Sequence, residues 1–96
     1  MPSIASLQAE IAEWADGLNP NRTPLSTIAK LLEDLGEVIA SEKMNDPLEL
    51  ADIFILALDL AHLQNVDITE AVMRKMEINR ARIWTISDNG AMSHVK

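Results

Sequence analysis

Apolar residues recur every three or four positions through four segments of the 96-residue chain, which is the spacing of one face of an α-helix. The first segment predicts a helix over residues 4–17, because Ser3 is a favourable N-cap and the following "GLNPNRTP" is rich in helix-ending residues. Thr23 and Pro24 open a second helix over 24–43, since proline is well tolerated in a first helical turn. The apolar face of the first helix consists of Ile4, Leu7, Ile11 and Trp14.

The stretch "MNDP" breaks the second helix and begins a third. Asp46 and Pro47 repeat the same cap-and-proline start, which predicts a helix over 47–64. After the link "QNVD", Asp67 with Glu70 three residues later resembles a capping box. We therefore expect a fourth helix that begins after Asp67 and ends at about Arg82 or Trp84.

The last twelve residues show no periodicity. The tail 85–96 contains Gly90 and reads "TISDNGAMSHVK" from Thr85, so we expect it to be mobile or to dock on a neighbouring subunit. Residues 1–84 are predicted to form a single all-α domain, similar to a four-helix bundle.

The third helix is apolar nearly all round, yet it carries three carboxylates. A helix such as "PLELADIFILALDLAHL" is normally buried on every side, in a bundle centre or a subunit interface. At about 100° per residue, Glu49, Asp52 and Asp59 form one stripe along it. Buried carboxylates require hydrogen bonds, cationic partners or metal ions, so a solvated face explains these acids poorly.

The second helix carries a further acidic group within "LLEDLGEVIA". Glu33, Asp34 and Glu37 lie within an arc of about 100°, which by itself is typical of a solvated face. The tight break at Asp46–Pro47 permits an antiparallel hairpin that brings two acid pairs together, Asp34/Glu37 and Glu49/Asp52. Facing helices with such pairs can surround a hard divalent cation, for which Mg²⁺ is the natural choice.

Composition narrows the possible functions. The net charge of −7 argues against nucleic-acid binding, which needs a clustered basic surface. The chain has no Cys, no basic amino-terminal region and no long apolar run, so we expect neither a signal peptide nor a membrane span. We expect a cytoplasmic protein, in the host cytoplasm if phage-encoded. Because 96 residues bury only a modest core, we also expect a homodimer or a dimer of dimers.

The two acidic motifs resemble those of a known family. Glu33-Asp34-x-x-Glu37, followed after eleven residues by Glu49-x-x-Asp52, is similar to the signature of the MazG-like, all-α nucleoside triphosphate pyrophosphohydrolases. "KLLEDLGEVI", "ELADIFILALDLA" and "DITEAVMRKMEINRARIW" resemble the family's helices in the same order, over about residues 25–84. Asp34 departs from the family, which usually has Glu there. The resemblance implies hydrolysis of the α–β phosphoanhydride of a (d)NTP to a (d)NMP and diphosphate, in stand-alone proteins of bacterial and phage type.

The resemblance also implies roles for individual residues. Glu33 and Glu37 would be catalytic, with Glu33 ligating an additional ion or orienting the attacking water. Two or more Mg²⁺ ions, for which Mn²⁺ would substitute, would be held by Glu33, Asp34, Glu37, Glu49 and Asp52. Residues that share a face of the fourth helix would grip the triphosphate, namely Lys75, Asn79 and Arg82. Lys30 either reaches a phosphate or pairs with the acids.

Other conspicuous residues admit plainer interpretations. Trp14 is expected in the core, with a stacking surface for the base as the alternative. Asp59 is expected to pair with a basic residue such as Lys75 or Arg74 rather than to ligate a metal directly. His62 is expected to be a core or interface residue rather than half of a di-iron site. Arg22 is expected to reach either the substrate or a neighbouring subunit, and Trp84 to anchor either the end of the fourth helix or an interface.

We therefore expect a Mg²⁺-dependent nucleoside triphosphate pyrophosphohydrolase that sanitises or shapes a nucleotide pool. A purine, and guanine in particular, is the weakly preferred base. The alternative is a non-catalytic helical oligomerisation or interaction module with a structural metal site. The basic face of Lys75, Asn79 and Arg82 distinguishes the two, because a structural site has no need of it.

Overall fold

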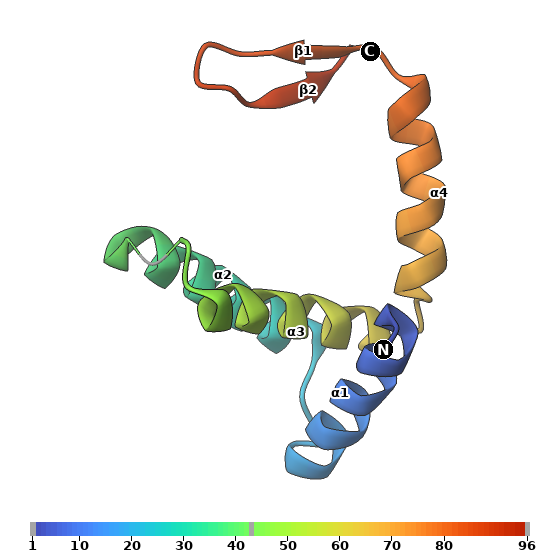
Figure 1. Ribbon diagram of the computed structural model, residues 1–96. Coiled ribbons are helices and arrows are strands. Elements are labelled where there is room, and N and C mark those ends of the chain that lie inside the picture. The colour runs from blue at the N-terminus through green and yellow to red at the C-terminus, as the bar shows by residue number, and fades with distance from the viewer. Residues whose placement is uncertain (1, 43, 96) are drawn as a thin grey trace.

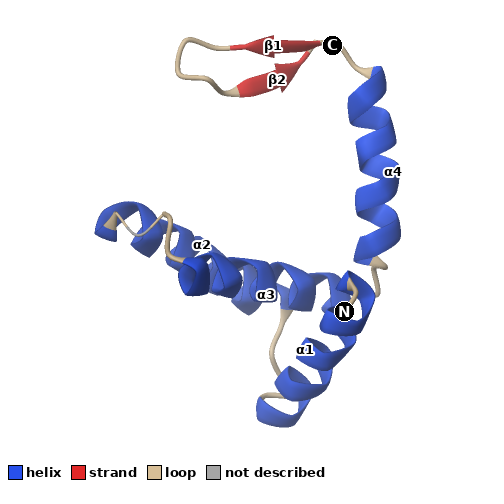
Figure 2. Ribbon diagram, viewed as in Figure 1, coloured by secondary structure: helices blue, strands red, loops and turns tan. Residues whose placement is uncertain are grey.

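The computed structural model describes residues 2–42 and 44–95. The described residues form four helices followed by a small antiparallel hairpin. Figures 1 and 2 show how these elements are arranged. The helices are α1 (Ile4–Leu18), α2 (Pro24–Ser41), α3 (Pro47–Leu63) and α4 (Ile68–Ala81), and the strands are β1 (Trp84–Ile86) and β2 (Met92–His94). Among the described residues, no helix has the length and apolar character needed to cross a bilayer.

The predicted helix starts are confirmed by their caps. Ser3 and Thr23 each form a capping box with the serine three residues later, and Pro24 stands in the first turn of α2. The Asp46 side chain accepts hydrogen bonds from two backbone N–H groups at the start of α3, and Asp67 accepts one from Glu70 N. The predicted end of the second helix at residue 43 lies outside the described residues, and α2 itself ends at Ser41.

The body of the molecule is formed by three helices. Both α1 and α2 pack on α3, and α2 runs back along α3 as the predicted hairpin requires (Figure 1). In contrast, α4 packs against α1 and then leads away from α2 and α3 to carry the hairpin (Figure 1). The all-α class is confirmed, but a single chain does not close a four-helix bundle, because α4 projects as an arm.

The core of one chain is small. Its buried apolar residues are Ala12, Ala15, Val38, Leu58 and Ala61. The prediction that the third helix is buried on every side is wrong for a single chain, since Leu48 is 77% exposed and Phe54 47% exposed. The reason is that α3 receives α1 and α2 on parts of its surface while α4 does not cover the rest.

The apolar residues of α2 also remain uncovered. Leu25 is 76% exposed, Leu32 70% and Ile39 69%. Together with Ile28 and Leu35 they follow the three-then-four spacing of a coiled-coil seam, and we call this set the α2 stripe. The residues that α2 buries within the chain are Thr27 and Val38, which lie on a different face.

The tail forms regular structure that the sequence pattern did not indicate. Trp84 pairs with His94 and Ile86 with Met92 across the hairpin, and Gly90 takes a φ of 87° in the turn. The Trp84 indole N–H donates to Asn79 O at 2.7 Å, which anchors the hairpin to the end of α4 as predicted for this tryptophan. Strands of three residues are too short to show a two-residue period, which explains the omission. Docking of the tail on a neighbouring subunit stays a prediction.

Candidate functional site

The two acidic motifs meet at one hollow between α2 and α3. The antiparallel packing of these helices places Asp34 and Glu37 opposite Glu49 and Asp52, as the spacing predicts. The hollow has a volume of about 380 Å³, and its lining residues are Trp14, Lys30, Asp34, Glu37, Glu49, Asp52, Ile55 and Leu56. The local signals that build it are the Asp46 cap and the Pro47 restart, because they turn the chain back on itself.

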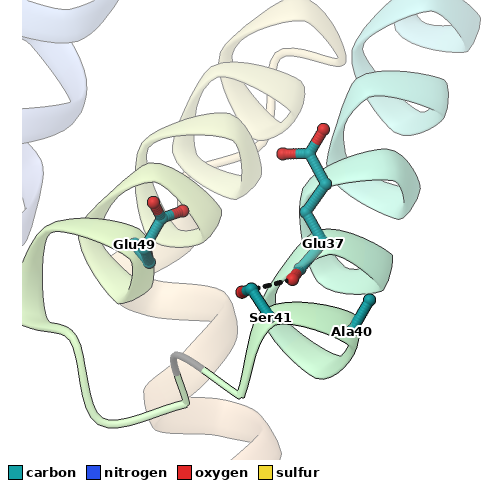
Figure 3. Close-up of a pocket in the computed structure, with 4 residues that line it drawn as sticks. All are labelled: Glu37, Ala40, Ser41 and Glu49. Atoms are coloured by element: carbon teal, nitrogen blue, oxygen red, sulfur yellow. Dashed lines mark hydrogen bonds between the residues drawn. The ribbon is translucent and has the colours of Figure 1, made fainter.

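A second hollow adjoins the first toward the ends of the helices. It has a volume of about 400 Å³ and is lined by Glu37, Ala40, Ser41 and Glu49 (Figure 3). The Ser41 hydroxyl donates to Glu37 O at 2.6 Å, so it is occupied by its own helix. Glu37 and Glu49 line both hollows and therefore stand at the centre of the acidic site.

Lys30 is a cation that pairs with acids of this site within the described part of the chain. Its Nζ lies 3.1 Å from an Asp34 carboxylate oxygen and 3.6 Å from a Glu33 carboxylate oxygen. The hydrogen bond with Asp34, followed by the charges of Asp34 and Glu33, raises the pKa of Lys30 above its ordinary value. Pairing with the acids, one of the two roles considered for Lys30, is therefore observed. Glu33 is not among the residues that line either hollow; its side chain is 59% exposed and is linked to the site through Lys30.

The donor set fits a hard divalent cation. Carboxylate oxygens from two facing helices are the ligands that Mg²⁺ and Mn²⁺ prefer. Among residues 2–42 and 44–95, no three Asp, Glu or His side chains lie close enough together to share one ion. Long acidic side chains of like charge separate when no ion holds them together, and Lys30 draws Asp34 toward itself.

Trp14 stands at this hollow and not in the core. Its side chain is 62% exposed and forms one wall beside the acids. The prediction of a core tryptophan is wrong because α1 packs on α3 through the small residues Ala12 and Ala15, which lie on a neighbouring face. The alternative interpretation, a stacking surface, is compatible with the observed position.

The basic face of α4 is not brought to the acids within one chain. Lys75, Asn79 and Arg82 lie on the arm, which leads away from α2 and α3 (Figure 1). Arg82 Nη1 lies 3.4 Å from His94 Nδ1 of the hairpin. The buried Oδ1 atom of Asn79 has no hydrogen-bond partner among the residues that the structure describes. A role for this face in substrate binding stays a prediction, and it would require a second copy of the chain.

Asp59 has a different partner from the one predicted. Arg22 binds it through two hydrogen bonds of 2.7 Å, Nε to Oδ2 and Nη2 to Oδ1. The side chains are only 9% and 7% exposed, so this is a buried pair. The expected basic partner is therefore found, but the suggested residues Lys75 and Arg74 are wrong because α4 does not reach this part of α3. The sequence offered no local signal for Arg22, which lies in the irregular connection between α1 and α2.

The same guanidinium reaches a second carboxylate. Arg22 Nη1 donates to Asp16 Oδ1 at 2.8 Å, and this bond lowers the pKa of Asp16 below its ordinary value. His62 Nε2 lies 3.5 Å from the other Asp16 oxygen and is 39% exposed. His62 is therefore a half-exposed neighbour of this cluster rather than a core residue.

Comparison with known proteins bears on this acidic site directly. The family profile described as dATP/dGTP pyrophosphohydrolase matches residues 7–96. The chain belongs to this family. Its membership confirms the resemblance drawn from Glu33-Asp34-x-x-Glu37 and Glu49-x-x-Asp52, together with the expectation of a nucleotide pyrophosphohydrolase.

Individual relatives come from phages. The chain is 62% identical over 96 residues to a dATP/dGTP diphosphohydrolase of Cyanophage S-2L, covering 99% of this chain and 91% of that protein. It is 41% identical to a dATP/dGTP diphosphohydrolase of Salmonella phage PMBT28, covering 97% of this chain but 32% of that longer protein.

A solved structure has the same fold. It is the Cyanophage S-2L MazG-like pyrophosphohydrolase bound to dGDP and three catalytic Mn²⁺ ions per active site. The TM-score is 0.90 at 60% identity, with 99% of this chain and 95% of that chain covered. The MazG-like all-α fold expected from the sequence is thereby confirmed.

Proposed function

We propose that this protein hydrolyses dATP and dGTP between the α and β phosphates, producing a deoxynucleoside monophosphate and diphosphate. The observation that carries the proposal is the single hollow lined by Asp34, Glu37, Glu49 and Asp52 together with Lys30 and Trp14. Family membership and the phage relatives named for dATP and dGTP support the choice of purine substrates.

The four acids are proposed to hold Mg²⁺, and Mn²⁺ as a substitute, in two or more positions. Bound divalent ions would neutralise phosphate charge and lower the pKa of a coordinated water. Glu37 and Glu49 line both hollows, which favours them as shared ligands at the centre. The three Mn²⁺ ions of the cyanophage neighbour support several ions rather than one. Glu33 is proposed to ligate an additional ion or to orient the attacking water.

Lys30 and Trp14 are proposed to contact the nucleotide. Lys30 holds Asp34 at 3.1 Å in this structure, and a cation bound by Asp34 would free the ammonium group for a phosphate oxygen. The indole of Trp14 is 62% exposed on the wall of the hollow, where a flat purine could stack on it.

The basic face of α4 is proposed to serve the acidic site of a second copy. Residues 1–67 contain twelve of the fifteen acidic residues and three of the eight basic ones. Residues 68–82 contain four basic and two acidic residues, so the arm is basic where the body is strongly acidic. Lys75 and Asn79 also share a face of α4 with the half-exposed Val72, and Arg82 follows directly at the end of this helix; an apolar residue among them is unusual for a face meant for water.

The exposed α2 stripe supports a homo-oligomer through a second contact. About 140° of helix surface separates Leu32 from Glu37, at about 100° per residue, so the stripe and the acids face nearly opposite directions. One copy docking its arm on the acids would leave the stripe uncovered. Two different contacts favour a dimer of dimers over a simple homodimer.

Diphosphate release from a panel of dNTPs and NTPs, with Mg²⁺ and separately with Mn²⁺, tests this function. We expect turnover of dATP and dGTP above the pyrimidine nucleotides. Glu37→Gln keeps the side-chain shape and removes the charge, and should lower kcat by at least about 100-fold, as for loss of one charge-stabilising group. Glu42→Gln, an exposed acid just beyond α2, is the matched control and should leave kcat unchanged.

Two results would contradict the proposal. Release of orthophosphate in place of diphosphate would place the cleaved bond elsewhere. Absence of turnover with every nucleotide would favour the alternative of a non-catalytic module with a structural metal site.

A further inference from the structure

Arg22 connects three segments of the chain through one guanidinium group. It donates to Asp59 on α3, to Asp16 on α1 and to Asn19 O in the connection between α1 and α2. Since α2 begins two residues later, at Pro24, this group lies where the three body helices meet. The bidentate pair with Asp59 is buried, which gives it a fixed geometry rather than a set of exchanging surface contacts.

The packing of α1 makes such a connection important. The buried residues of α1 are Ala12 and Ala15, whose short side chains interlock weakly with the neighbouring helix. Near its beginning α1 is held by Gln8, whose Nε2 donates to Val66 O at 3.1 Å and to Leu58 O at 3.5 Å. Near its end it is held by Asp16 through Arg22. Hydrogen bonds of Gln8 near the beginning of α1 and of Asp16 near its end therefore fix the position of α1 along α3.

Trp14 is carried by the same turn of α1 as Asp16. It is the wall that α1 contributes to the acidic hollow, whereas the metal-binding acids all come from α2 and α3. Loosening α1 would therefore move the Trp14 wall and leave the four carboxylates in place.

We infer that Arg22, held by Asp59, is a positioning residue that sets the distance between Trp14 and the acids and so sets nucleotide affinity. The inference rests on the proposed function, because it assigns Trp14 to nucleotide binding. This role also accounts for the buried charges of Arg22 and Asp59, which the hydrolysis itself does not need.

Steady-state kinetics with dGTP separates positioning from general damage. Arg22→Met keeps much of the side-chain volume and removes the hydrogen bonds, and we expect KM to rise about 10-fold while kcat stays within about threefold. Asp16→Asn leaves the buried pair intact and weakens only the tie to α1, so a rise in KM of about threefold is expected. Glu13→Gln, another exposed α1 carboxylate, is the matched control and should leave KM unchanged.

A second measurement does not depend on turnover. In a Trp84→Phe background Trp14 is the only tryptophan, and added Mn²⁺ should quench its emission because the ion binds beside it. Arg22→Met should reduce this quenching, while the Mn²⁺ concentration at half effect stays the same because the acids are undisturbed. If the unaltered protein has no turnover, the proposed function fails, and the quenching still tests the position of Trp14.

Two results would overturn the inference. One is an unchanged KM and unchanged quenching in folded Arg22→Met and Asp16→Asn. The other is a fall in kcat and thermal stability with KM unchanged, which is the signature of a purely structural pair. Should Arg22→Met fail to fold, as circular dichroism would reveal, Asp16→Asn decides between these outcomes.

Discussion

Replacing Leu32 by alanine distinguishes a free helix surface from an interface between two copies. Leu32 lies at the middle of the α2 stripe and is 70% exposed within one chain. Leucine and alanine are both good helix formers, so the substitution should leave α2 itself intact. Any large effect must then come from a contact that a single chain does not make.

The size of the effect follows from the exposed fraction. Complete burial of a leucine side chain is worth about 1.5–3 kcal/mol, so the 70% still exposed corresponds to about 1–2 kcal/mol per copy. In a two-fold contact both copies lose this amount, for a total of about 2–4 kcal/mol. With a factor of ten for each 1.4 kcal/mol, the dissociation constant should rise roughly 30- to 700-fold. On a free surface the same change would alter the stability by no more than about 0.5 kcal/mol.

Sedimentation equilibrium over a range of protein concentrations measures this dissociation constant. Leu18→Ala is the matched control, because Leu18 is also a leucine that is 70% exposed, and it lies at the end of α1 and is not part of the α2 stripe. We expect the Leu32→Ala variant to dissociate into monomers at a far higher protein concentration than the unaltered protein. The Leu18→Ala variant should have the same dissociation constant as the unaltered protein. Equal dissociation constants for all three, or a monomer at every concentration, would refute the assignment of the stripe as an interface.

Two further predictions concern assembly and pH. Mixing equal amounts of inactive Glu37→Gln and an inactive Lys75→Ala/Arg82→Ala double variant should restore about one quarter of the turnover of the unaltered protein. Half of the randomly formed pairs are then mixed, and each mixed pair has one intact site out of two. No restoration would mean that the basic face does not serve a neighbouring copy. Because the Arg22 hydrogen bond lowers the pKa of Asp16 below its ordinary 3.8, the stabilisation from Asp16 is complete above that pH and is lost as the pH falls through the lower folded value. The difference in Tm between the unaltered protein and Asp16→Asn should therefore be present at about pH 6 and shrink toward about pH 3, whereas a constant difference would exclude the charge as its origin.

The acidic site was predictable because its signals are local. The spacing of Asp34 and Glu37, and of Glu49 and Asp52, places each pair on one helix face. A capped break between the helices permits an antiparallel hairpin in which the pairs face each other, and all four acids line the observed hollow.

The surroundings of that site were less predictable. Trp14 was wrongly expected in the core, and Asp59 was expected to pair with a basic residue of α4. Nothing local reveals that α1 packs through alanines or that the α1–α2 connection brings Arg22 to α3. Hydrophobic periodicity does not distinguish a leucine on the α2 stripe from a leucine in the core. It indicates that a helix face is apolar, but not which part of the molecule covers that face.

By itself the sequence determined the four helices, their caps and the two facing carboxylate pairs, because helix formation and capping depend on residues within a few positions of one another. Only the tertiary structure decided that Arg22 neutralises Asp59, that Trp14 stands at the acids and that α4 leaves the body as an arm. Those outcomes depend on contacts between residues far apart in the chain, where packing and charge are balanced over the whole molecule. Sequence spacing carries no record of that balance.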